Sequence, residues 1–243
     1  MMNTYEQRAK QDLELWKTKI AAKPSKFMRL SKNAQTVMNR KIPDKIHQLI
    51  SASIKAMVEA VLSGSAYIQK NSEPNRTPIS LEEVESKAKN RLEIYRKTAV
   101  VEGAGTGAGG IFLGMTDFPL LLSIKMKYLF SVTQLYGYDP NKLEERIFIL
   151  LVFQLAFSSA EKKKELLETI VNWESEQEKF TQIDWQSFQQ EYRDSIDFVK
   201  MMQLVPGIGA IVGAWANYNL MDQLGETAQN CYRLRWFYRK EDE

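Results

Sequence analysis

Four carboxylates lie in or beside apolar stretches of this 243-residue chain, where acid–base or metal chemistry would be most easily arranged. They are Glu102, Asp117, Asp222 and Glu226. If helices brought them together, paired carboxylates could exchange protons with a substrate or coordinate a cation. A carboxylate-based hydrolase is therefore one interpretation of the sequence.

The other residue types that catalyse reactions or bind metals are scarce. His47 is the only histidine and Cys231 the only cysteine. This excludes a site with two histidine ligands, a thiolate zinc site and an intrachain disulfide. Carboxylate-bridged di-iron sites in helical bundles normally need two Glu-x-x-His motifs. We therefore expect no metal and no cofactor.

Structural roles also explain the carboxylates. Asp117 precedes a Phe-Pro pair, which is typical of a helix N-cap followed by proline in the first turn. Asp222 and Glu226 are four residues apart and share one helical face, so with Arg233 they predict surface or interhelical ion pairs. These roles favour a protein that is not an enzyme.

The elements that must position these residues are predicted to be helices. Apolar residues recur every three or four positions from Ile46 to Leu62, which predicts an amphipathic helix. The run Ile147-Phe-Ile-Leu-Leu-Val-Phe153 is apolar on all sides and predicts a central buried helix over residues 140–158. No stretch alternates with a period of two for long, so the fold class is all-α.

Several residues mark where helices begin and end. Ser80 with Glu83 forms a capping-box pattern that opens a helix. Gly137 is placed to end a helix, and Asp139 with Pro140 to begin the next. Together with 44% apolar and 26% charged residues, these signals predict one folded multi-helix bundle over residues 1–243. Its expected parts are basic helices over 1–70, a loop over 71–79 and a core over 80–243.

Glycines recur at four-residue spacing in two apolar segments, 98–115 and 205–216. The positions concerned are Gly103, Gly107, Gly110, Gly114, Gly209 and Gly213. This spacing allows a second helix to approach closely. Each glycine inside a helix costs about 1 kcal/mol relative to alanine, so close packing must compensate. We expect two glycine-rich, closely packed central helices.

Residues 201–221 carry no charge, a length sufficient to cross a membrane. The segment also contains Gln203, Pro206 and Asn217, and the mean hydropathy of the chain is −0.37. These features favour burial within the bundle, with a membrane-inserted hairpin as the alternative.

Positive charge is concentrated near the N-terminus, although the net charge is only +3. Basic residues outnumber acidic ones by 12 to 5 over residues 1–60. The candidate membrane-surface residues are Lys17, Lys19, Lys23, Lys26, Phe27, Arg29 and Lys32. Such a segment suits an anionic bilayer surface. The alternatives are solvated helices that pack their apolar residues on the core, and an acidic partner such as RNA.

No RNA-binding motif is visible, so we expect no nucleic-acid partner. The first twenty residues lack the apolar run of a signal peptide, which predicts a cytoplasmic protein.

Five motifs together resemble the EcsC family. They are Glu102-Gly-Ala-Gly-Thr-Gly-Ala-Gly109, Gly114-Met-Thr-Asp-Phe-Pro119, Tyr136-Gly-Tyr138, and Pro206-Gly-Ile-Gly-Ala-Ile-Val-Gly213 followed by Arg233-Leu-Arg-Trp236. The resemblance covers nearly the whole chain. It implies a link with the Ecs ABC transporter, beside which members are encoded, and it offers no catalytic residues to carry over.

Together these observations predict a non-catalytic accessory or scaffold protein, peripheral to the cytoplasmic face of the membrane and linked to an ABC transporter. One alternative is a protein that binds a lipid or another apolar small molecule between the glycine-rich helices. The other is the carboxylate-based hydrolase.

Overall fold

The computed structural model describes residues 2–22, 44–64, 80–106, 111–180 and 210–242. Within the helices, the side chains of 44–47, 100–106, 111–117, 160–161, 210–218 and 242 lie outside that description. All eight regular elements in the described parts are α-helices, which confirms the predicted fold class.

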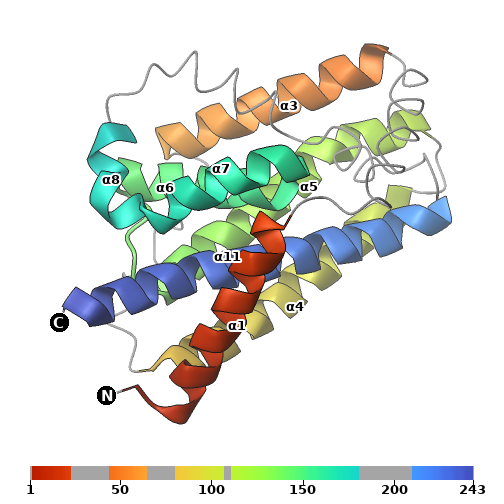
Figure 1. The fold of residues 1–243 in the computed structure, drawn as a ribbon. Coiled ribbons are helices and arrows are strands. Elements are labelled where there is room, and N and C mark those ends of the chain that lie inside the picture. The colour runs from red at the N-terminus through yellow and green to blue at the C-terminus, as the bar shows by residue number, and fades with distance from the viewer. Residues whose placement is uncertain (1, 23–43, 65–79, 107–110, 181–209, 243) are drawn as a thin grey trace.

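The helices form one bundle, with the two chain termini at the same end (Figure 1). In chain order they are α1 (Thr4–Ala21), α3 (Asp44–Ser63), α4 (Leu81–Thr106), α5 (Ile111–Leu135), α6 (Leu143–Phe157), α7 (Ala160–Val171), α8 (Trp173–Phe180) and α11 (Ala210–Asp242).

The amphipathic and apolar patterns fold as predicted. In α3, the apolar stripe buries Ile50, Ile54 and Val61 in the core. In α6, every residue from Ile147 to Phe157 is buried, because α3, α5, α7, α8 and α11 all pack around this helix. The prediction of a central buried helix is confirmed, and burying apolar side chains on all its faces makes α6 a large contributor to stability.

Helices α4 and α5 pack against each other as an antiparallel pair (Figure 1). The rings of Tyr95 and Tyr128 meet edge to face across this pair, with centroids 6.0 Å apart. At the start of α4, the Ser80 hydroxyl accepts a hydrogen bond from the Glu83 N–H at 3.2 Å, as the capping pattern predicted. These contacts fix where α4 begins and which face of it meets α5.

The chain reverses after α5 at Gly137. Gly137 has a φ of 83°, a left-handed conformation that glycine adopts without strain. Its N–H bonds the Gln134 carbonyl, and the Tyr138 N–H bonds the Thr133 carbonyl, which together make a Schellman motif. The predicted helix end is therefore confirmed.

Two predicted helix starts are wrong. Asp117 is not an N-cap, because α5 begins at Ile111 and continues through Pro119. The next helix, α6, begins at Leu143 with Lys142 as N-cap, three residues later than predicted. Asp139 instead accepts the N–H of Asn141 at 2.9 Å and stabilises a turn before the helix.

The longest helix, α11, has 33 residues and contacts α1, α4, α5, α6 and α7. It runs antiparallel to α4, since Leu92 lies at Gly225 while the earlier residue Glu85 bonds the later residue Arg233. Almost all of its residues from Leu220 to Phe237 are buried or half-buried. The C-terminal helix is thus a central element, although its sequence is polar.

Two glycine-rich, closely packed central helices are not shown in the described residues, because part of each glycine-rich segment lies outside them. Gly103 belongs to the end of α4, Gly114 to the start of α5 and Gly213 to the start of α11. Because α4 runs antiparallel to both α5 and α11, its last turns and the first turns of α5 and α11 lie at one end of the bundle. Gly107, Gly110 and Gly209 lie outside the described residues.

Candidate functional site

Buried charges and polar groups gather along the second half of α11. Because α11 contacts most of its neighbours, its charged side chains pair with residues of α1, α4, α6 and α8. The buried or half-buried side chains in this half that bond another helix are Gln229, Tyr232, Arg233, Arg235 and Trp236. We refer to this set as the α11 polar row.

Arg233 binds Glu85 of α4 in a buried bidentate pair. The Nε–Oε1 distance is 2.6 Å and the Nη2–Oε2 distance is 2.7 Å. Glu85 Oε2 also accepts hydrogen bonds from the Tyr5 hydroxyl at 2.7 Å and from Gln229 Nε2 at 2.6 Å. This carboxylate therefore joins α1, α4 and α11, and its two oxygens share four hydrogen bonds.

Electrostatics in this pair favour the charged form of Arg233. Burial alone would lower the pKa of Arg233, but its hydrogen bonds and attraction to Glu85 outweigh burial and raise that pKa. Burial, followed by the hydrogen bond to Glu85, raises the pKa of Tyr5 to about 12. Arg233 therefore stays charged and the Tyr5 hydroxyl stays protonated near neutral pH.

Arg235 lies on another face of α11 and binds two carboxylates. Its Nη1 and Nη2 lie 2.5 and 2.7 Å from the Glu145 carboxylate of α6, and its Nε bonds Glu174 of α8. Its guanidinium carbon lies 3.5 Å from the centroid of the Tyr138 ring, a close cation–π contact. Burial opposes the charge of Arg235, but these partners raise its pKa above the ordinary value.

Glu6 joins α1 to the last turns of α11. It is buried and accepts hydrogen bonds from Lys240 Nζ at 2.6 Å and from the Trp236 indole at 3.3 Å. It also completes a capping box with Asn3 at the start of α1. Burial would raise the pKa of Glu6, but these donors outweigh burial and lower it.

The predicted catalytic carboxylates do not share one site among the described side chains. Asp222 forms an ion pair with Arg96 of α4, and Glu226 lies 3.8 Å from Lys19 of α1. Arg233, which was expected to pair with both, binds Glu85 instead. Glu102 belongs to α4 and Asp117 to α5, with side chains outside the described residues.

Two of the predicted membrane-surface lysines lie on α1. Lys17 pairs with Glu14 at 3.1 Å, and Lys19 projects from the last turn with three-quarters of its side chain exposed. Lys23, Lys26, Phe27, Arg29 and Lys32 lie outside the described residues.

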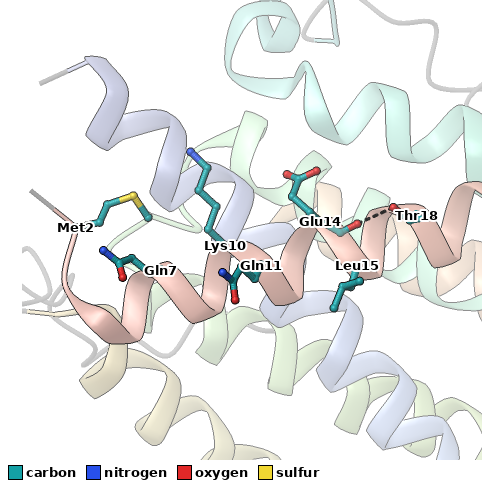
Figure 2. A pocket seen from close by; sticks show the side chains of 7 residues that line it. All are labelled: Met2, Gln7, Lys10, Gln11, Glu14, Leu15 and Thr18. Carbon is teal, nitrogen blue, oxygen red and sulfur yellow. Dashed lines mark hydrogen bonds between the residues drawn. The ribbon is translucent and has the colours of Figure 1, made fainter.

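A hollow of about 700 Å³ lies along the outer face of α1 (Figure 2). Met2, Gln7, Lys10, Gln11, Glu14, Leu15 and Thr18 line it. Leu15 is 71% exposed, and the Thr18 hydroxyl is bonded to the Glu14 carbonyl at 2.9 Å. The charged residues that line the hollow are Lys10 and Glu14, and the lining contains no pair of carboxylates and no nucleophile beside a base. The hollow therefore has the character of a contact surface.

Lys125 of α5 is a buried charge that the sequence analysis missed. It is 0% exposed, and its Nζ has no hydrogen-bond partner among the described residues. Burial alone lowers the pKa of this amine to about 7. The sequence signal was present, since a lone lysine stands in the apolar run from Phe118 to Met126.

Two further properties concern metal binding and membranes. In the described parts of the chain, no group of three or more His, Cys, Asp or Glu residues is arranged to hold a metal ion. Nor does any helix of those parts combine the length and apolar character needed to cross a membrane.

The chain is similar to known bacterial proteins over most of its length. It is 52% identical to Protein EcsC of Bacillus subtilis (strain 168) over 220 residues, covering 90% of this chain and 91% of that protein. It is 32% identical to Uncharacterized protein YdbA of the same organism over 162 residues, covering 65% and 58%. No solved structure matches it significantly. The model of the EcsC protein family matches residues 7–237, and this chain therefore belongs to the EcsC family.

Proposed function

We propose that this protein is a non-catalytic accessory or scaffold protein that works at the cytoplasmic face of the membrane together with an ABC transporter. The transporter link rests on membership of the EcsC family and on the resemblance described above. The membrane link rests on the basic N-terminal region.

One observation carries the membrane part of the proposal. The last turn of α1 presents Lys19 to solvent, and the basic, aromatic segment 23–32 follows directly. An anionic bilayer attracts each nearby Lys or Arg by about 1 kcal/mol, and aromatic rings settle at the level of the headgroups. A bundle whose first helix is tied to α4 and α11 through Tyr5 and Glu6 would hold such a segment at a fixed position.

The ionic contacts support a scaffold rather than an enzyme. Two of the candidate catalytic carboxylates, Asp222 and Glu226, are each paired with a cation of a neighbouring helix. The buried Glu85 and Glu145 are saturated by arginines from α11. Groups in these states hold helices together, and none of these four carboxylates is free to take a proton from a substrate.

Liposome flotation tests the membrane part. We expect the protein to float with vesicles containing anionic lipid and to be released as salt rises, because screening weakens surface attraction. Changing Lys17, Lys19, Lys23 and Lys26 to glutamate should abolish flotation. The matched control carries the same change of charge on exposed lysines of α4 and α7: Lys87, Lys89, Lys97 and Lys164. Flotation of both variants like the wild type, or equal binding to neutral vesicles in high salt, would contradict the membrane part.

Co-purification tests the transporter part. Tagged protein expressed with the ABC transporter encoded beside it should co-elute with that transporter from detergent-solubilised membranes. Elution without it after chemical cross-linking would contradict this part and leave the lipid result unaffected.

A further inference from the structure

Lys125 is a buried charged residue that has no oppositely charged partner among the described residues. The other charged side chains that are buried in the described residues are Glu6, Glu85, Glu145, Arg233 and Arg235. Each of them has an oppositely charged partner within 2.7 Å. The Lys125 amine alone has neither an ion pair nor a hydrogen bond there.

The surroundings of Lys125 on its own helix are apolar. Residues three and four positions away share its face of α5, and these are Leu121, Leu122, Tyr128 and Leu129, all buried. Lys127, two residues further on, points to the opposite, exposed face of α5. The two lysines therefore have the same chemistry and contrasting environments.

An ammonium group without an acceptor is costly in such surroundings. It can lose its proton, or it can receive a negative charge from outside the chain. The Lys125 amine is neutral at weakly alkaline pH, so binding of an anion beside it would be coupled to the uptake of a proton. An anion would supply the partner that every other buried charge of the bundle already has.

We propose that the core around Lys125 binds a single-chain amphiphile whose anionic headgroup, a carboxylate or a phosphate monoester, pairs with the Lys125 ammonium. The apolar side chains around the amine favour a ligand with a hydrocarbon chain over a small hydrated anion, which would lose its water without gaining other donors. This inference goes beyond the proposed function and does not depend on it.

The helices around Lys125 suggest where the hydrocarbon chain lies. Lys125 is about three turns from Gly114 along α5. At that end of the bundle, α4 and α11 contribute Gly103 and Gly213. Because glycine has no side chain, we place the hydrocarbon chain along α5 toward this end.

Calorimetry with defined probes tests the site. The probes are palmitate, hexadecyl phosphate and, as the uncharged control, methyl palmitate, each below its aggregation limit. We expect at least one of the two anions to bind and methyl palmitate to bind at least roughly 10-fold more weakly. The two anionic arms decide between a carboxylate and a phosphate headgroup. Binding of neither anion would overturn the proposal.

Substitutions and proton exchange separate this site from nonspecific adsorption. Lys125→Met should weaken anion binding roughly 10- to 100-fold, whereas Lys127→Met on the exposed face should leave it unchanged. Wild-type protein at pH 8, titrated in two buffers of different ionisation enthalpy, should take up about one proton per ligand bound. Equal binding by the Lys125 variant, or binding without proton uptake, would overturn the proposal.

Discussion

Arg233 of α11 holds Glu85 of α4 through two hydrogen bonds of 2.6 and 2.7 Å, at a point where both side chains are almost fully buried. The Tyr5 hydroxyl reaches the same carboxylate from α1. Three helices that are far apart in the sequence therefore meet at one acid, which makes this pair a determinant of the fold.

Removal of either partner should destabilise the protein strongly. Glu85→Leu or Arg233→Met leaves a buried charge without its partner and should cost about 3–5 kcal/mol in the free energy of unfolding. The double variant should lose much less than the sum, because no charge remains unpaired and the remaining cost comes from the hydrogen bonds of Tyr5 and Gln229. Urea denaturation measures all three values.

An exposed pair on α4 provides the control for that cycle. Lys87 and Glu83 lie 2.6 Å apart with about half of each side chain exposed. Lys87→Met should change stability by less than about 1 kcal/mol, since exposed ion pairs contribute little. Additive losses in the Glu85/Arg233 double variant would show that the buried pair does not act as a unit.

The pKa of Glu6 predicts part of the acid sensitivity. Its pKa is lowered from 4.5 in the folded protein by Lys240, Asn3 and Trp236, which outweigh burial. Between 4.5 and the lower folded value, the unfolded chain binds more protons, so stability is lost as the pH falls through this window. Glu6→Gln should be less stable at pH 7 and should lose less stability on acidification.

Denaturant titrations between pH 3 and 7 check this expectation. Glu14→Gln is the matched control, because Glu14 is an exposed acid on the same helix and pairs only with Lys17 on the surface. A Glu6→Gln variant with the acid sensitivity of the wild type would contradict the assignment.

Local patterns in the sequence were sufficient for several elements. The apolar repeat of α3 and the continuous apolar run of α6 specify which faces are buried, because burial follows from side-chain type at helical spacing. Gly137 was readable as a helix end because a left-handed residue there favours glycine. Each of these signals lies within a few residues of the structure it determines.

Local patterns could not predict which charged residues pair when they lie far apart in the sequence. Glu85 and Arg233 are 148 residues apart. Each is a charged residue of the kind that is common on a solvent-exposed helix face, so neither residue type indicates burial. Arg233 was assigned to Asp222 and Glu226 because they are its neighbours in sequence. The structure pairs all three with other helices, since α1, α4 and α11 lie side by side.

The four-residue spacing of glycines identified two glycine-rich segments, but it did not identify the close contact between α4 and α11 in the described core. The close approach of α4 and α11 occurs at Gly225, where an added Cβ would lie 2.6 Å from Leu92 Cδ2. Gly225 lies in a polar stretch without glycines four residues away, so the four-residue rule could not select it.

The Gly225 contact predicts coupling between two substitutions. In a helix interior, alanine in place of glycine gains about 1 kcal/mol, but at this position the methyl group pushes against Leu92. Gly225→Ala should therefore stabilise the Leu92→Ala variant by about 1 kcal/mol and stabilise the wild type less or destabilise it. Thermal melts of the four proteins measure the difference, and an equal effect in both backgrounds would refute the contact.

The buried amine of Lys125 makes a prediction for the ligand-free protein. Its pKa is lowered to about 7 by burial, whereas an unfolded chain releases the same proton near its ordinary value of 10.5. Between these values the unfolded state binds more protons. Stability should therefore rise with pH above 7, by about 1 kcal/mol per pH unit from this group.

Lys125→Met should remove that dependence and stabilise the protein at pH 7, because methionine fills the same space without a buried amine. Lys127→Met, on the exposed face of the same helix, should keep the dependence of the wild type. Guanidinium denaturation at pH 7, 8 and 9 separates the outcomes, with the range kept below pH 10 so that tyrosines stay protonated. A Lys125→Met protein that is less stable than the wild type throughout this range would show that the amine has a stabilising partner in the ligand-free bundle.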